Sequence, residues 1–295
     1  MTLRIGTRGS RLALAQASEV AAFLTEVGVE TELVPIVTAG DRGASAKESP
    51  AGVKGLFVAE ITEALARGEV DVAVHSAKDL PSEDPPGVVV ASVPERAVPY
   101  DVLVSRDGEL QDGATVGTSS LRRRSQLVRS RPSLKVRDVR GNVDTRLRKL
   151  GDGEFDALVI AAAGLARLGI DPEHVAPIPV EEMVPAPGQG ALAVQVREGS
   201  AAADTVTRID DRGSHVAFDT ERGLAGLLGG GCRLPLGAYA EWRNGVIRLL
   251  AVVVRPDGSD LLWSQVEAQT PGDAAGEAAE ILRAGGAERI LQEVR

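Results

Sequence analysis

The sequence predicts an α/β protein that ends in a smaller α+β unit, and three observations support this fold class. Strand-like and helix-like apolar patterns alternate over the first two thirds of the 295-residue chain. After about Gly213 the order changes to one helix followed by three strands. The chain has also reached the size at which a single hydrophobic core stops growing. We therefore expect two α/β units with parallel sheets and right-handed crossovers, followed by a third, smaller unit.

Apolar periodicity predicts the elements of each unit. In the first unit, strands are expected at residues 3–6, 31–37, 70–74 and 88–93, and helices at residues 13–24 and 56–66. In the second unit, strands are expected at residues 101–105, 115–117, 134–139 and 157–161, and helices at residues 119–129 and 143–150. The third unit is expected to contain a helix ending at Leu228, strands near residues 237–242, 245–254 and 261–267, and closing helices.

Composition narrows the function classes. A hydrophobic content of 43% with 25% charged residues is typical of a soluble globular protein. The first residues lack the apolar core of a signal peptide, and no apolar run has transmembrane length, so we expect a cytoplasmic protein without a membrane partner. A net charge of -9 and an aromatic content of 3% argue against a nucleic-acid binder.

Basic residues are nevertheless concentrated in one stretch. Residues 121–149 contain nine Arg and two Lys against two Asp. Guanidinium groups bind carboxylates and phosphates bidentately, so an anionic ligand is expected. The arginines at strand–helix junctions are the candidates, namely Arg122, Arg123, Arg140 and Arg146. Others are assigned to solvated helix faces, namely Arg124, Arg129, Arg131 and Arg148.

A Gly-Thr pair occurs at two predicted strand ends, each just before a helix. Gly6-Thr7 leads to Ser10, and Gly117-Thr118 leads to Ser119 and Ser120. Such turns offer backbone N–H groups and a helix dipole to an anion, although ordinary N-capping by the hydroxyl residues explains either turn alone. In two facing α/β units both turns would lie at one cleft.

The segment from His75 to Leu80 follows an apolar strand and carries several reactive groups. Adjacent residues on a strand face opposite sides, so His75 and Ser76 do not form a hydrolase pair. Asp79 is a candidate for handling protons or a cationic intermediate, or it forms an ion pair with Lys78.

Cys232 is the single cysteine of the chain, and it follows three glycines. One cysteine makes neither an internal disulfide nor a multi-thiolate metal site, and no metal is expected. The glycines would let a bulky group approach the sulfur, and Arg233 favours the thiolate. The alternative is a small buried apolar side chain.

Seven motifs, in this order and spacing, resemble the porphobilinogen deaminase (hydroxymethylbilane synthase) family. They are Lys54-Gly55-Leu56-Phe57, His75-Ser76-Ala77-Lys78-Asp79-Leu80-Pro81, Gly117-Thr118-Ser119-Ser120-Leu121-Arg122-Arg123, Arg140-Gly141-Asn142, Ala162-Ala163-Gly164-Leu165, Pro187-Gly188-Gln189-Gly190-Ala191 and Gly230-Gly231-Cys232. The resemblance covers nearly the whole chain and weakens past Pro235.

The resemblance implies a fold and an activity. Residues 1–95 with 191–210, and residues 96–190, would form two domains like type II periplasmic binding proteins, and residues 211–295 would form an α+β domain carrying the cysteine. The implied enzyme is a transferase that joins four porphobilinogen molecules onto a dipyrromethane cofactor, releasing ammonia each time, and then hydrolyses off the linear tetrapyrrole. Each pyrrole carries an acetate and a propionate. A monomer is expected.

The family roles are carried over residue by residue. Cys232 matches the thioether anchor of the dipyrromethane, and Asp79 matches the catalytic carboxylate. Cofactor-binding groups match Ser76, Lys78, Thr118, Ser119, Ser120, Arg122, Arg123, Arg140 and Arg146. Substrate-binding groups match Arg8, Arg167 and Gln189. Residues 38–55 read as a lid whose end matches Lys54 and Phe57, but Pro50 stands where relatives often carry a lysine.

Two other classes of protein stay open on the residues alone. A solute-binding protein would share the two-lobed fold but would need an export signal and no reactive cysteine. A nucleic-acid-binding regulator could use the arginine-rich helix, against the negative overall charge.

Overall fold

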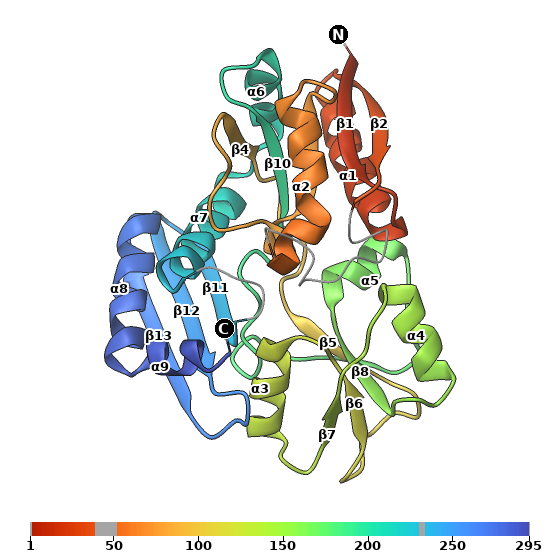
Figure 1. The fold of residues 1–295 in the computed structure, drawn as a ribbon, viewed down its shortest axis with the longest axis vertical. Coiled ribbons are helices and arrows are strands. Elements are labelled where there is room, and N and C mark those ends of the chain that lie inside the picture. Colours follow the sequence, from red (N-terminus) through yellow and green to blue (C-terminus); the bar gives the residue numbers. More distant parts are fainter. Residues whose placement is uncertain (1, 39–51, 230–233, 295) are drawn as a thin grey trace.

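The structure is a computed structural model that describes residues 2–38, 52–229 and 234–294, and for residues 52–57 it describes the backbone alone. The described strands form three sheets, two of five strands and one of three. Figure 1 shows the first five-stranded sheet at the top, the second below it and the small sheet at the side. The predicted fold class of two α/β units and a smaller α+β unit is confirmed.

The first sheet has the strand order β2-β1-β3-β10-β4. Its strands are β1 (Thr2–Arg8), β2 (Glu30–Ile36), β3 (Val72–Ser76), β4 (Val88–Ser92) and β10 (Leu192–Arg197). Its helices are α1 (Arg11–Glu26), α2 (Gly52–Ala66), the 3-10 turn η1 (Ala77–Asp79), α6 (Ala201–Val206) and the 3-10 turn η2 (Thr207–Ile209). Buried aliphatic side chains of β1, β3, β10 and α1 form one core on this sheet.

The second sheet repeats this plan in the order β7-β6-β8-β5-β9. Its strands are β5 (Asp101–Ser105), β6 (Thr115–Gly117), β7 (Lys135–Arg137), β8 (Ala157–Ala161) and β9 (Val175–Pro177). Its helices are α3 (Leu121–Ser130), α4 (Val143–Gly151) and α5 (Ala162–Leu168). β1 and β6 hold the same place in the two sheets, so the two Gly-Thr turns are structurally equivalent.

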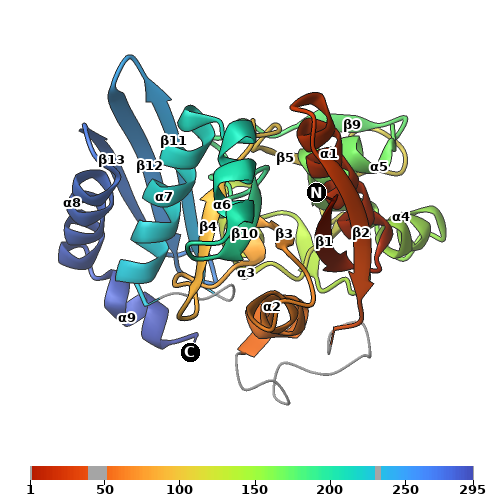
Figure 2. The same ribbon diagram turned by 90° about the horizontal axis from the view of Figure 1, so that it is seen from above.

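The third sheet is an antiparallel meander in the order β11-β12-β13. Its strands are β11 (Leu236–Arg243), β12 (Val246–Val254) and β13 (Leu261–Ala268), and its helices are α7 (Arg212–Leu227), α8 (Pro271–Ala284) and α9 (Ala287–Gln292). Helices α7 and α8 cover one face of this sheet (Figure 2). Their buried alanines and leucines pack against it. The opposite face contacts Val184 of the second unit.

The prediction of parallel sheets is wrong in one respect, because both large sheets are mixed. β10 runs antiparallel to β3 and β4, and β5 runs antiparallel to β8 and β9. The chain crosses from the first unit to the second between β4 and β5, and it crosses back between β9 and β10. β5 and β10 are therefore the strands that follow these two crossings. Periodicity did not predict β9, β10, α5 or α6, and α2 begins four residues earlier than expected.

Hydroxyl and amide side chains begin the helices at the strand ends. Ser10 accepts a hydrogen bond from Ala13 N and caps α1, Ser120 caps α3, and Asn142 caps α4. The N-capping alternative therefore describes both Gly-Thr turns. Among the helices of the described residues, none is long and apolar enough to cross a membrane.

A buried carboxylate of the third unit binds both crossings between the α/β units. Glu221 on α7 is 0% exposed and accepts hydrogen bonds from Ala240 N at 2.7 Å and Gly188 N at 2.6 Å. It also forms a bidentate ion pair with Arg96, at 2.7 and 3.1 Å. Arg96 lies in the first crossing between the α/β units and Gly188 in the second. The third unit therefore holds both crossings through one side chain.

Replacing this carboxylate should destabilise the protein strongly. Glu221→Gln leaves the Arg96 charge buried without its counterion, which should lower the free energy of unfolding by about 3–5 kcal/mol. The control is Glu267→Gln, which removes the partner of Arg248 in an exposed pair and should cost less than about 1 kcal/mol. Urea unfolding of both variants measures the difference, and equal losses would contradict the role given to Glu221.

Candidate active site

The end of β3 is held against the second crossing between the α/β units. Ala77 N donates to Ala191 O at 3.1 Å. Gly188 has a φ of +74°, and a Cβ there would lie 3.0 Å from the backbone of Ala77 and Lys78. Only glycine combines that conformation with so close an approach. The crossing thus fixes η1, which carries Lys78 and Asp79.

A small pocket of about 60 Å³ opens beside η1. Its polar lining residues come from β1, α1 with its N-cap, the end of β3 and η1, and they are Arg8, Ser10, Gln16, His75, Ser76 and Asp79. Gln16 Nε2 donates to Ser76 Oγ at 2.6 Å. The structure therefore brings three of the predicted site residues together, Arg8, Ser76 and Asp79.

His75 also lines this pocket, although sequence reasoning gave it no role. Its side chain is 5% exposed, and burial lowers the pKa of the imidazole to about 4. The imidazole is therefore neutral at physiological pH. Its Nε2 atom is buried and has no hydrogen-bond partner among the described residues.

The ammonium group of Lys78 has a lowered pKa. Burial lowers the pKa of its ammonium to about 8, against the opposing effects of Asp79 and Asp101 and with added repulsion from Arg123 and Arg122. Its ammonium makes no hydrogen bond or ion pair with any residue that the structure describes. The alternative that Lys78 and Asp79 form a simple ion pair is therefore not observed.

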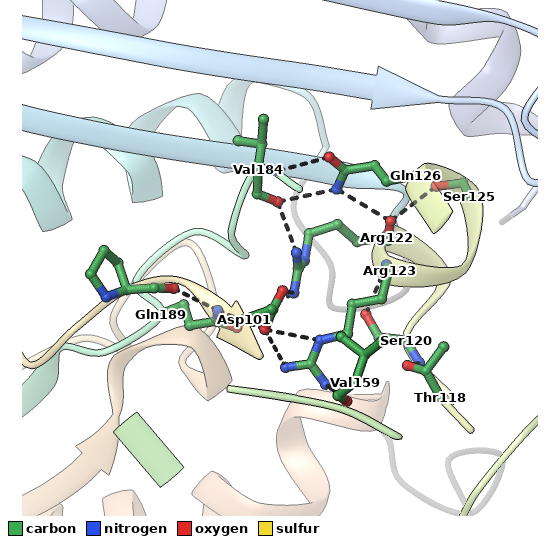
Figure 3. A network of polar contacts seen from close by, with 11 residues as sticks. Asp101, Thr118, Ser120, Arg122, Arg123, Ser125, Gln126, Val159, Val184 and Gln189 are labelled. Atoms are coloured by element: carbon green, nitrogen blue, oxygen red, sulfur yellow. Dashed lines mark hydrogen bonds and ion pairs between the residues drawn. The ribbon is translucent and has the colours of Figure 1, made fainter. Parts of the chain in front are cut away.

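Arg122 and Arg123 surround one carboxylate, Asp101, at the start of β5 (Figure 3). Arg122 Nη2 donates to Asp101 Oδ2 at 2.8 Å, and Arg123 Nη2 donates to Asp101 Oδ1 at 2.7 Å. Gln189 Nε2 adds a bond to Asp101 Oδ1 at 2.9 Å. Arg122 Nη1 also donates to Val184 O at 2.8 Å. The two arginines that sequence reasoning selected are therefore both joined to the start of β5, and Arg122 is also joined to the second crossing.

Asp101 is the residue of this cluster that sequence reasoning missed. Burial alone would raise the pKa of this 0% exposed carboxyl, but the guanidinium groups of Arg122 and Arg123 lower the pKa well below its usual value. The carboxylate is thus charged at every physiological pH. Its one sequence signal was an acidic residue at the start of an apolar strand. The Nε of Arg122 stays buried without a partner among the described residues.

The remaining residues of the second unit lie around this cluster. Thr118 Oγ1 accepts from Ser120 N, and Ser119 Oγ donates to Val139 O. Arg140 is exposed. Burial lowers the pKa of Arg146, and so does the nearby charge of Arg123. Arg146 therefore belongs to the same cationic cluster as Arg123.

Arg167 and the arginines assigned to solvated faces have their own partners. Arg167 on α5 forms an ion pair with Glu19 on α1. Arg124 pairs with Asp138 and Arg148 with Asp152, both near the surface. Arg131 is exposed, and so is Arg129, whose Nη1 reaches Gly258 O of the third unit at 3.0 Å.

Three predicted site residues cannot be placed. Cys232 lies outside the described residues, between the end of α7 at Leu227 and the start of β11 at Leu236. The side chains of Lys54 and Phe57 are also outside them, and so is most of the predicted lid at residues 38–55, including Pro50. Within the described part of the chain, no group of three His, Cys, Asp or Glu side chains could hold a metal ion.

Lys78 should titrate with a pKa of about 8 instead of the usual 10.5. In the folded state the ammonium is disfavoured, so the side chain opposes folding below about pH 8 and does so less as the pH rises toward 10.5. Competitive acetylation measures the pKa, because only the neutral amine reacts and the rate of Lys78 modification should level off above about pH 8. An inflection near 10.5 would show that the ammonium is well solvated.

Known proteins resemble this chain over its full length. The family model described as "Porphobilinogen deaminase, dipyromethane cofactor binding domain" matches residues 3–205, and the model of the C-terminal domain of that family matches residues 216–285. The porphobilinogen deaminase of Brevibacillus brevis is 44% identical over 99% of this chain and 97% of its own, and that of Thermus thermophilus is 44% identical over 99% and 98%. Among solved structures, the methionine-binding protein MetQ covers 70% of this chain and 89% of its own at 15% identity and a TM-score of 0.44, which is too distant to carry a conclusion. On the family models and these sequence relatives, the chain belongs to the porphobilinogen deaminase family.

Proposed function

We propose that the protein is a hydroxymethylbilane synthase, which deaminates porphobilinogen and joins four molecules head-to-tail on a dipyrromethane primer. One observation carries this proposal. The partly buried ammonium of Lys78, which makes no ion pair with any residue that the structure describes, is next to Asp79 in the chain, and the charges of Arg122, Arg123 and Asp101 act on it. A protein that buries so many cations around one carboxylate side chain is built for a ligand with several carboxylates. Family membership leaves the solute-binding and nucleic-acid alternatives without support.

The residues present fit a dipyrromethane. Each pyrrole carries two carboxylates, and the cluster offers the Nε of Arg122, which is buried without a partner among the described residues, and the half-buried ammonium of Lys78. Ser76, exposed Arg140 and partly buried Arg146 add donors around them. We propose Lys78, Arg122, Arg123, Arg140 and Arg146 as the residues that hold the carboxylates of the cofactor, with Ser76, Thr118, Ser119 and Ser120 on the same wall.

Asp79 is proposed as the catalytic carboxylate. When bound, the cofactor supplies the pyrrole carbon from which the product chain grows. The loss of ammonia from the substrate leaves positive charge on the pyrrole, and a carboxylate held at the edge of the pocket stabilises that charge. Asp79 lines the pocket together with Arg8, which would bind a carboxylate of the same substrate. Its oxygens can also accept the pyrrole N–H proton and return it.

Several finer assignments complete the proposal. The thiol of Cys232 would anchor the cofactor through a thioether. Gln189, placed by the second crossing, and Arg167 would lie at the substrate end of the site, and Lys54 and Phe57 at the end of a lid. We further propose a cytoplasmic monomer whose three sheets are three domains, formed by residues 1–95 with 191–210, 96–190 and 211–295.

Intact-protein mass tests the activity directly. The purified protein should carry the added mass of two linked pyrroles and should convert porphobilinogen to hydroxymethylbilane. Cys232→Ala should fold, carry no added mass and have essentially no activity, because the thioether can form on no other cysteine of the chain. Added mass on another residue, or full turnover by the variant, would refute the assignment.

Asp79→Asn tests the carboxylate. The amide preserves shape but not charge, so this variant should bind porphobilinogen nearly normally while single-turnover chemistry slows by several orders of magnitude. Asp79→Glu keeps the charge and should retain more activity. An Asn variant with near-normal chemistry would leave Asp79 without a catalytic role and would direct attention to His75.

A further inference from the structure

Arg167 bridges the two α/β units through a carboxylate of its own chain. Its Nε donates to Glu19 Oε2 at 2.7 Å, and its Nη2 lies 3.4 Å from Glu19 Oε1 and 3.0 Å from Gly190 O. The Arg167 side chain is 8% exposed, whereas that of Glu19 is 29% exposed. The guanidinium is thus enclosed, and its counterion is the part that solvent can reach.

Elements that line or support the pocket also carry this pair. Glu19 follows Gln16 by three residues, so both project from the same face of α1, and Gln16 lines the pocket and binds Ser76. On the other side of Arg167, Gly190 immediately precedes Ala191, whose carbonyl accepts the hydrogen bond of Ala77 N. The guanidinium is therefore connected to the pocket residues through α1 on one side and through residues 190 and 191 on the other.

Asp101 and Glu19 both serve as counterions of arginines, but they differ in how easily a ligand carboxylate could replace them. Asp101 is fully buried and receives hydrogen bonds from Arg122, Arg123 and Gln189, so displacing it would leave several buried donors unpaired. Glu19 is held by one arginine and is open to water. An incoming carboxylate could take its place on Arg167 and keep both N–H···O bonds, while Glu19 would regain its hydration.

We propose that Glu19 is a built-in competitor for the carboxylate of the substrate. It occupies Arg167 in the ligand-free chain, and one carboxylate of porphobilinogen exchanges with it on binding. Glu19 thereby sets the affinity for substrate without touching the reacting atoms. This inference rests on the proposed function and on Arg167 as a substrate-binding residue. An arginine that is free in only a fraction of the molecules weakens the apparent affinity by that fraction.

A second ion pair between α1 and the other unit provides the control. Arg11 pairs with Asp144 on α4, and both side chains are well exposed to solvent. Asp144→Asn breaks this bridge without releasing an arginine of the proposed site. Glu19→Gln and Asp144→Asn thus each remove one bridge between the units, and only the first removes a competitor.

The experiment compares steady-state kcat and KM for the wild type, Glu19→Gln, Glu19→Ala, Asp144→Asn, Arg167→Leu and the double variant Glu19→Gln/Arg167→Leu. Glu19→Gln and Glu19→Ala should lower KM by about fivefold with kcat nearly unchanged, as expected for an arginine otherwise free in roughly a fifth of the molecules. Asp144→Asn should leave KM within about twofold of the wild type. In the Arg167→Leu background, Glu19→Gln should change nothing.

Calorimetric titration with porphobilinogen in the Asp79→Asn background measures the same affinities without turnover, and Glu19→Gln should tighten binding there by the same factor. An unchanged or raised KM in both Glu19 variants would overturn the inference. An equal drop in Asp144→Asn, or a drop that persists without Arg167, would assign the effect to looser contact between the units. If the proposed function itself were wrong, the wild type would neither bind nor consume porphobilinogen.

Discussion

The arrangement of the site depends on the burial of two guanidinium groups around the single carboxylate of Asp101. Two like charges that close together would repel each other and would not stay buried without a shared counterion. By binding both, Asp101 joins β5 to α3, and Gln189 and Val184 extend the network into the second crossing. That crossing in turn packs against Ala77 and Lys78. The ion pairs of Asp101 therefore help to fix the position of Asp79, through the second crossing that packs against η1.

A second carboxylate extends this constraint to the third unit. Glu221 binds Arg96 and Gly188, and Arg96 Nε donates to Gln189 O at 2.8 Å. Gln189 thus connects Asp101 with Glu221. Its side chain binds Asp101, and its carbonyl oxygen accepts from Arg96, which is paired with Glu221. A few buried ionic contacts of this kind fix orientation more narrowly than an apolar interface, because their hydrogen-bond geometry tolerates little movement. The positions of the two crossings and of α7 are fixed in this way.

Local pattern predicted the elements well and the partners of the site residues poorly. β5, β6 and β8 have the predicted bounds because their apolar runs are short and sharply ended. Arg122 and Arg123 could be selected by residue type and position, but Asp101 lies about twenty residues away and on another element. The low pKa of Lys78 likewise arises from burial by segments that are distant in the sequence, so the residues next to Lys78 could not predict it. The reversed direction of β10 follows from the return of the chain, and not from its own residues.

The internal carboxylates also resolve the contrast between an acidic protein and a cationic cleft. A net charge of -9 coexists with a stretch of nine arginines because several site arginines have a counterion supplied by the same chain. Such pairing lowers the positive potential that a passing polyanion would meet, which limits non-specific capture. Under the proposed function, a small polycarboxylate would bind the Nε of Arg122, which has no partner among the described residues, and would exchange with Glu19 on Arg167. Selectivity for that ligand would then come from which counterions are buried and which are exposed, a property of the fold more than of the charge count.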